Sequence, residues 1–445
     1  MFTLTYWLSA GLLSVRAVEP ADLDLEVRFL RAAPTLAPAA IAPYRRALTA
    51  DLFEVVKVHG GSFAGHEILV LRWSIWDGRE VLGGMDGQAT GRIQPVPWAG
   101  QKGLRAERIF VGPKDVERML YYNPGSRPAG RGSGGGGKTP VAWLESEALN
   151  AVLPGKTKGW LFLKREVEHA AAGEFWKEDW KPGGVVLDFR DQLDALGIEL
   201  LLVPIPTKVS LAGDHLDENL EPGPIGFATW MKKEGIEVLD LEPVFCRARD
   251  EGKQVYCASD SHWTPVACRL AAAAIRSRVE KQPWWKDLKP EEGRFRTGVP
   301  SLREIDGDLS LRLKATREHQ SETVMAQEIV AGNGRPIELA QPESPFILLG
   351  DSHTLVFSEG SEELHGRGAG LPDGLALELG RPVDVVANRG SGSHGARINL
   401  YQSRSRNPRH PDYWKNKKLL IWCFSVREFT GVGPWEKLPV ARRRK

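Results

Sequence analysis

Long apolar runs are nearly absent from this sequence of 445 residues. Residues 2–15 form the only one, and it is shorter than the roughly 18 to 20 apolar residues that a membrane-spanning helix requires. An excess of one charge is also missing, because 59 Lys and Arg residues balance 57 Asp and Glu residues. Basic side chains are scattered except at residues 442–445. We therefore expect neither a multi-spanning membrane protein nor a nucleic-acid partner.

Cysteine is scarce as well. The four cysteines, Cys246, Cys257, Cys268 and Cys423, are too dispersed for the tight clusters that hold structural metals. We expect no metal and no cofactor. Cys246 and Cys257 flank the polar segment 247–253, and their spacing fits both a disulfide that closes this loop and two free buried thiols.

The first residues have the features of an export signal. The apolar stretch 2–15 ends in Val15-Arg16-Ala17, a small-residue pattern that suits cleavage after Ala17. We expect a signal peptide over residues 1–17 and a periplasmic or secreted protein. With 42% apolar and 26% charged residues, the chain has the balance of a globular protein that buries a core.

The N-terminal third predicts a small β domain. Between residues 18 and 122, β-prone runs such as 53–58 and 67–73 alternate with Gly-rich turns, which indicates a small all-β barrel or sandwich. Residues 123–140, rich in Gly and Pro, follow as a linker. Residues 132–139 match the P-loop pattern, but no buried strand precedes them and Pro140 follows, so we expect no nucleotide.

From residue 141 to 435 the pattern changes to alternating strands and helices, which predicts an α/β domain. Apolar, turn-bounded runs indicate interior strands of a parallel sheet. These runs lie at residues 199–203, 236–241, 346–349, 383–387 and 419–424. A helix is expected after Thr264, which can cap it, with Pro265 in the first turn.

Two short motifs carry the chemistry. Ser352 follows the strand at 346–349 through Gly350-Asp351, and reactive groups in open α/β sheets collect at the carboxyl ends of strands. A serine hydroxyl needs an imidazole to take its proton and a carboxylate to orient that imidazole. His262 and Asp260 can supply them, since a separation of two residues puts both side chains on one side of an extended backbone. Alone, each motif also fits an ordinary turn or a structural histidine.

Together these motifs resemble the SGNH-hydrolase-like domain of the alginate O-acetyltransferase family, the AlgX/AlgJ type. The resemblance spans roughly residues 159–430. It rests on Gly-Trp-Leu-Phe-Leu at 159–163, Pro-x-Lys at 206–208, Asp-x-His-Trp at 260–263, Gly-Asp-Ser at 350–352, and an Ile-Trp strand leading to Arg427-Glu428. The order is the specific feature, because ordinary SGNH esterases have Gly-Asp-Ser first and the Asp/His motif last.

The resemblance implies a flavodoxin-like parallel sheet with permuted motif order, preceded here by the small β domain. It implies that Ser352 takes an acetyl group from a donor and passes it to a sugar hydroxyl, with His262 as general base and acid and Asp260 orienting it. The implied partners are a polysaccharide acceptor and a membrane-bound O-acyltransferase that donates acetyl. The alginate-associated members that carry an accessory sugar-binding domain place it after the catalytic domain, whereas here the β domain comes first, so the polymer need not be alginate.

The oxyanion and substrate contacts have several candidates. We expect the backbone N–H of Ser352 and the Gly390-Ser391-Gly392 turn to bind an oxyanion, although an ordinary Gly/Ser loop fits equally. Arg427 stands where ordinary SGNH enzymes have an asparagine, and it either binds substrate or pairs with Glu428 or another carboxylate. Lys208 is a further substrate candidate. His353, beside the nucleophile, is a competitor of His262 as base.

Three functions remain open at this point. The leading hypothesis is an exported-polysaccharide O-acetyltransferase. A carbohydrate acetyl esterase would use the same residues, because only water exclusion and acceptor binding separate transfer from hydrolysis. A non-catalytic polysaccharide-binding assembly protein that has kept the fold is the alternative from a different class.

Overall fold

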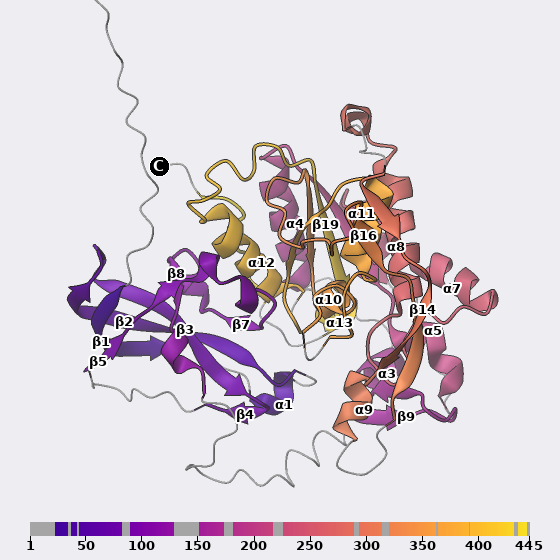
Figure 1. The fold of residues 1–445 in the computed structure, drawn as a ribbon, viewed down its shortest axis with the longest axis horizontal. Helices are drawn as coiled ribbons and strands as arrows, with labels where there is room; N and C mark the ends of the chain where they lie inside the picture. Colours follow the sequence, from indigo (N-terminus) through magenta and orange to yellow (C-terminus); the bar gives the residue numbers. More distant parts are fainter. Residues whose placement is uncertain are drawn as a thin grey trace, which may run out of the picture.

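The computed structural model describes most of the chain (Figure 1). The described residues are 23–33, 37–41, 44–81, 90–128, 151–172, 181–216, 226–288, 293–313, 320–361, 364–390, 392–430 and 435–442. The expected signal peptide at 1–17, most of the linker and the P-loop-like segment lie outside them. Among these described residues, no helix combines the length and apolarity needed to cross a membrane.

The N-terminal region forms an eight-stranded mixed sheet, on the left in Figure 1. Its main path runs β5-β1-β2-β3-β8-β6, with β4 paired to β3 and β7 to β2. The strands are β1 (Asp24–Ala32), β2 (Ala47–Gly60), β3 (Glu67–Trp76), β4 (Arg79–Glu80), β5 (Thr90–Ile93), β6 (Val96–Pro97), β7 (Ile109–Phe110) and β8 (Leu120–Tyr122), with helix α1 (Pro38–Ile41) before β2. A β-rich N-terminal region is thus present. A closed barrel or a sandwich is not confirmed, since this path is open.

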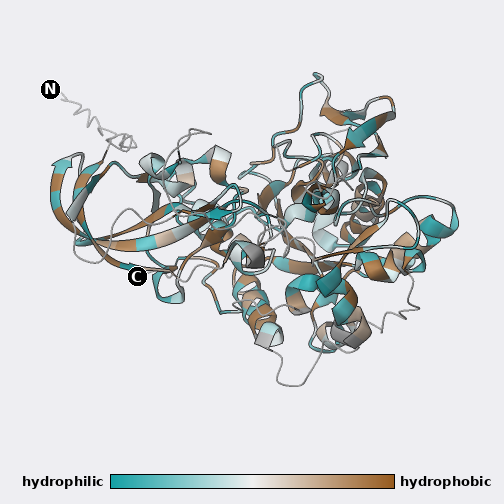
Figure 2. Cartoon of the chain, turned by 90° about the horizontal axis from the view of Figure 1, so that it is seen from below, coloured by the Kyte–Doolittle hydropathy of each residue, from teal (hydrophilic) through white to brown (hydrophobic). Residues whose placement is uncertain are grey.

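Strand alternation gives this sheet two apolar faces. On β3, Leu69 and Leu71 face one cluster, while Ile68 and Val70 face the other. Apolar and polar residues alternate visibly along these strands in Figure 2. The first cluster also contains Ile398 and Tyr401, so the N-terminal sheet packs on the helices that follow β18 in the second region.

The second region is a three-layer α/β/α structure around a parallel sheet of order β12-β11-β19-β17-β18. Its strands are β11 (Glu199–Ile205), β12 (Glu237–Val238), β17 (Phe346–Gly350), β18 (Asp384–Ala387) and β19 (Leu419–Ser425). Helices α8 (Pro265–Val279) and α11 (Leu371–Leu379) cover one face, and α4 (Lys181–Asp194) and α12 (His394–Leu400) cover the other (Figure 1). Helix α6 (Gly226–Lys233) packs on the same face as α4 through Met231. The interior strands are apolar on both faces, as expected when helices cover both.

The remaining elements lie around this sheet. They are β9 (Val152–Pro154), β10 (Leu161–Leu163), α3 (Lys164–Ala172), α5 (Lys208–Ala212), α7 (Glu242–Asp250), β13 (Phe295–Thr297), β14 (Ser301–Ile305), α9 (Asp308–Arg312), β15 (Glu322–Ala326), β16 (Ile329–Ala331), α10 (Ser352–Leu355), η8 (Tyr401–Ser405) and α13 (Arg427–Thr430). Short 3₁₀ turns lie at Trp98–Gly100, Lys102–Leu104, Pro113–Asp115, Pro124–Ser126, Gly213–His215 and Pro283–Asp287.

The sequence pattern predicted this α/β region closely. Each expected strand is present, although the run at 236–241 is a strand only over Glu237–Val238. The expected helix begins at Pro265, and the Thr264 hydroxyl accepts from the Ala267 N–H at 3.3 Å. The exact domain limits at 18–122 and 141–435 stay predictions. All four cysteines are free thiols, so Cys246 and Cys257 are not bonded to each other.

Candidate active site

Ser352 lies at a sharp turn between β17 and α10. Asp351 caps α10, accepting from the His353 N–H at 2.9 Å through Oδ1 and from the Ser425 N–H at 2.8 Å through Oδ2. Only glycine fits at position 350, because a Cβ there would lie 2.1 Å from the Thr354 hydroxyl. Ser352 is the first residue of α10, and the N–H groups of a first helical turn have no acceptor within the helix.

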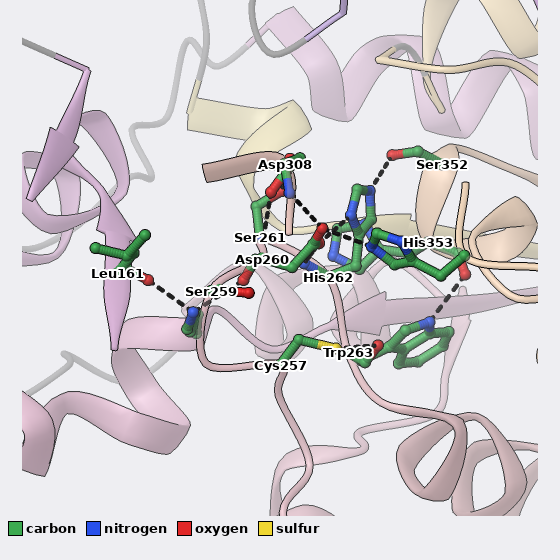
Figure 3. Close-up of polar contacts among 12 residues, drawn as sticks. Leu161, Cys257, Ser259, Asp260, Ser261, His262, Trp263, Asp308, Ser352 and His353 are labelled. Atoms are coloured by element: carbon green, nitrogen blue, oxygen red, sulfur yellow. Dashed lines mark hydrogen bonds and ion pairs between the residues drawn. The ribbon is translucent and has the colours of Figure 1, made fainter. Parts of the chain in front are cut away.

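Asp260 and His262 lie in the loop between the paired residues Tyr256 and Trp263. Asp260 Oδ1 accepts from the His262 N–H at 2.8 Å and lies 2.6 Å from Nδ1 of the same residue. The other ring nitrogen, His262 Nε2, lies 2.8 Å from Ser352 Oγ (Figure 3). All three residues are at most 2% exposed. The structure thus brings the three predicted residues into one continuous carboxylate–imidazole–hydroxyl chain.

Asp260 holds a second imidazole that the sequence motifs did not reveal. Its Oδ2 accepts from the Asp308 N–H at 2.6 Å and lies 2.7 Å from His365 Nε2. Burial would raise the pKa of Asp260, but the imidazoles of His262 and His365 outweigh it and hold that pKa well below its usual value. The carboxylate therefore stays ionised between two histidines.

This second imidazole should make stability depend on pH. Burial opposes charging of His365, yet Asp260 raises the pKa of His365 above its ordinary 6.5. A histidine whose pKa is higher in the folded than in the unfolded protein adds its full stabilisation of the fold at pH values below the unfolded-state pKa. This stabilisation is lost as the pH rises through the folded-state pKa. We expect His365→Gln to lower the free energy of unfolding more at about pH 6 than at about pH 9. Urea unfolding at both pH values measures the free energy of unfolding, and His66→Gln, a change at an exposed histidine, is the control. If His365→Gln lost the same free energy at both pH values, the His365–Asp260 ion pair would not be the cause.

The Asp260 loop is held by Lys208, which is 2% exposed. Its ammonium donates to the carbonyls of Leu161 at 2.6 Å and of Ala258 and Asp260 at 2.8 Å. An ammonium has three N–H bonds, and all three are used. In this structure the Lys208 ammonium therefore has no N–H group left to donate to a substrate. Its three hydrogen bonds hold the loop that carries Asp260.

Lys208→Met is expected to lower the free energy of unfolding by about 3 kcal/mol, because methionine leaves three buried carbonyls without a donor. Chemical denaturation measures the loss. Lys253→Met is the matched control, since Lys253 pairs with Glu251 at the surface, where both side chains are about half exposed. If the two variants unfolded at the same denaturant concentration, Lys208 would not have the supporting role.

Two carboxylates hold the rest of the loop. Glu322 accepts from the N–H groups of Ala258 and Ser259, and Asp308 accepts from the N–H of Ser261 at 2.6 Å. Asp260, His262 and Asp308 also place three ligand atoms within 4.8 Å of one another, a spacing that a metal ion would tolerate. The Asp308 carboxylate is bound to Ser261, whereas its backbone N–H donates to Asp260, and Asp260 binds His262.

The two glycines proposed for the oxyanion lie beside the nucleophile. A Cβ on Gly392 would lie 2.9 Å from Asp351 Cβ, and the Gly392 carbonyl accepts from Trp422 Nε1 at 2.8 Å. Gly390 has a positive φ of 67°, and a Cβ there would lie 2.6 Å from both Arg108 Nη1 and the Tyr44 ring. Ser391 lies outside the described residues. The oxyanion role of these amides stays a prediction.

Arg427 and His353 both have defined contacts, and the substrate or oxyanion role of Arg427 stays a prediction. Arg427 Nη1 lies 3.2 Å from Glu166 Oε2, so Arg427 forms an ion pair with a carboxylate, which was one of the predicted alternatives. The partner is Glu166 rather than Glu428. The His353 ring lies 4.6 Å from the His262 ring, centroid to centroid, and burial lowers the pKa of His353. The imidazole that contacts Ser352 Oγ is that of His262.

A parallel sheet between two helical layers, with serine at the end of an interior strand and Asp/His in a neighbouring loop, is the arrangement of the SGNH hydrolase-like class. Residues 152–426, more than half of the chain, match the family described as the SGNH hydrolase-like domain of acetyltransferase AlgX. The chain belongs to this family and is an SGNH-type acetyltransferase.

The chain is similar to several named proteins. The probable alginate O-acetylase AlgJ of Pseudomonas fluorescens is 27% identical over 301 residues, covering 64% of this chain and 71% of the relative. The alginate biosynthesis protein AlgX of Pseudomonas putida is 26% identical over 201 residues, covering 43% of this chain and 38% of the relative. A solved structure, the O-acetyltransferase domain of Pseudomonas putida AlgJ, has 18% identity and a TM-score of 0.45, covering 63% of this chain and 92% of that domain.

Proposed function

We propose that the protein transfers acetyl groups to hydroxyls of an exported polysaccharide, with Ser352 as nucleophile, His262 as base and acid, and Asp260 as orienting carboxylate. The observation that carries the proposal is the continuous chain from Asp260 Oδ1 through both ring nitrogens of His262 to Ser352 Oγ, with links of 2.6 and 2.8 Å. Links of this length allow a proton to move directly from the hydroxyl to the ring.

The reaction follows in two balanced halves. Ser352 Oγ attacks the acetyl carbonyl carbon while its proton passes to His262 Nε2. The donor oxygen then leaves and takes that proton, and an acetyl-serine remains. A sugar hydroxyl next gives its proton to His262 and attacks the same carbonyl, and Ser352 recovers the proton as it leaves. Ionised Asp260 stabilises the imidazolium in both halves.

The acceptor and donor are proposed from the relatives. Proteins named alginate O-acetylase and alginate biosynthesis protein are similar to this chain, which favours a polysaccharide acceptor. A membrane-bound O-acyltransferase is the proposed acetyl donor, and the periplasm or the exterior the proposed compartment. Ser352 is only 2% exposed, so donor and acceptor must both reach a nearly buried hydroxyl.

The test is incubation of the protein with a chromogenic acetyl ester, with and without uronate or neutral oligosaccharides. Mass spectrometry of the sugar then detects any acetyl group gained. Acetylated sugar supports transfer. Free acetate alone, at a rate unchanged by any acceptor, would assign the esterase activity instead, and sugar binding without ester turnover would assign a non-catalytic assembly role.

A further inference from the structure

The N-terminal sheet reaches the nucleophile through a tyrosine. Tyr44 lies between α1 and β2, 308 residues before Ser352, and its hydroxyl donates to Ser352 Oγ. The Tyr44 N–H donates to the carbonyl of Ile41 at 3.1 Å, and Ile41 packs in a small cluster with Ala47 and Ile75 of the same sheet. The position of Tyr44 is thus set by the N-terminal region and not by the catalytic layers.

Several contacts dock this part of the N-terminal region against the Ser352 loop. The Arg389 N–H donates to the Ala106 carbonyl at 2.9 Å, and Asn388 Nδ2 donates to the Glu107 carbonyl at 2.6 Å. Both residues directly follow β18, whose partner strand β17 leads into Ser352. The docking therefore fixes the distance between the N-terminal sheet and the nucleophile.

Gly390 admits the tyrosine. The Tyr44 ring and Arg108 both lie where a side chain at position 390 would stand, with contacts of 2.6 to 2.7 Å to its ideal Cβ. Any other residue at 390 would displace them. The glycine that the sequence singled out is therefore also the point where the N-terminal region approaches Ser352.

We propose that Tyr44 is a catalytic hydrogen-bond donor, which binds Ser352 Oγ in the resting enzyme and the acetyl oxyanion in the tetrahedral intermediate. This rests on the proposed function. A serine hydroxyl that donates to His262 still has lone pairs for the phenol. When Oγ bonds to the acetyl carbon, the π electrons of the carbonyl move to its oxygen, which is attached to the same carbon. A donor that touches Oγ is therefore within reach of that oxyanion.

The phenol remains a donor throughout and exchanges no proton. Burial raises the pKa of Tyr44 above its ordinary value, so the hydroxyl stays neutral at physiological pH. The only proton that moves is the one shared by Ser352, His262 and the leaving or entering oxygen. The N-terminal sheet thereby becomes part of the active site.

The test is Tyr44→Phe, which keeps the ring and removes only the hydroxyl. The release of chromophore from p-nitrophenyl acetate, followed by stopped flow, measures acylation of Ser352. We expect the acylation rate constant to fall by about 10²-fold, the typical effect of one lost oxyanion donor, with KM changed less than about threefold. Tyr122→Phe is the matched control, because the Tyr122 hydroxyl accepts from Trp73 within the N-terminal sheet.

Ser352→Ala, measured in the same assay, separates a failure of the Tyr44 proposal from a failure of the proposed function. If Ser352→Ala is inactive and Tyr44→Phe acylates at the rate of the Tyr122→Phe control, Tyr44 has no catalytic role. A loss in Tyr44→Phe that is confined to KM, or that follows a lowered melting temperature, likewise overturns it. If Ser352→Ala itself keeps the wild-type rate, the proposed function fails, whatever the tyrosine variant does.

Discussion

Ser352→Ala is expected to lower the rate of acetyl transfer by on the order of 10⁴-fold or more, since alanine has no oxygen to carry the acetyl group. The fold should survive, because Asp351 rather than Ser352 caps α10 and holds the turn through Ser425. The measurement is the rate of acetyl-sugar formation, together with the mass of the protein after incubation with donor. Wild type should gain one acetyl group, and the variant none.

Ser403→Ala is the matched control for this loss. Ser403 is equally buried in the same region, and its hydroxyl donates to the carbonyl of Asn399 on α12. It should remain close to the wild-type rate. Substantial transfer by Ser352→Ala, or an acetyl group still attached to that variant, would remove Ser352 from the mechanism.

Asp260→Asn is expected to lower the rate by about 10⁴-fold, as the same change does in other Ser-His-Asp sites. An amide nitrogen facing His262 Nδ1 would stabilise the tautomer whose proton sits on Nε2, and that tautomer cannot accept a proton from Ser352. The variant also loses the negative charge between two imidazoles. Steady-state kinetics should show the loss in kcat rather than in KM.

A second buried aspartate supplies the control for Asp260. Asp373 lies in α11, where burial raises its pKa to about 6 and its carboxylate accepts from the Gly370 N–H at 3.1 Å. Asp373→Asn makes the same chemical change outside the site, so its activity should stay within about threefold of wild type. If the activity of Asp260→Asn were no lower than that of Asp373→Asn, an orienting role of Asp260 would be excluded.

Much of the α/β region was predictable from local pattern. The runs at 199–203, 346–349 and 419–424 are apolar throughout because helices cover both faces of their sheet, and each is a strand in the structure. Thr264 and Pro265 marked the start of α8, because they suit the first turn of a helix. The N-terminal strands were also foreseen, whereas their arrangement in one open sheet was not.

The candidate site was predictable only in part. Asp260 and His262 are two residues apart in a bent loop, where Asp260 Oδ1 accepts from the His262 N–H, and Ser352 follows an obvious strand. Lys208 and Gly390 were selected as substrate or oxyanion contacts, and Arg427 either as such a contact or as the partner of a carboxylate. The structure surrounds the Lys208 ammonium with carbonyls, pairs Arg427 with Glu166 and packs Gly390 against Tyr44, and none of these partners was evident from the sequence.

What the sequence determined by itself is a set of local features: a serine at a strand end, an Asp-x-His motif and strands with two covered faces. They are local because residue spacing sets which side chains share a face of one element. Only the tertiary structure decided which partners complete the site. His365 on Asp260 and Tyr44 on Ser352 come from segments 105 and 308 residues away, and the packing of separate layers, which leaves no periodic trace in the sequence, brings them there.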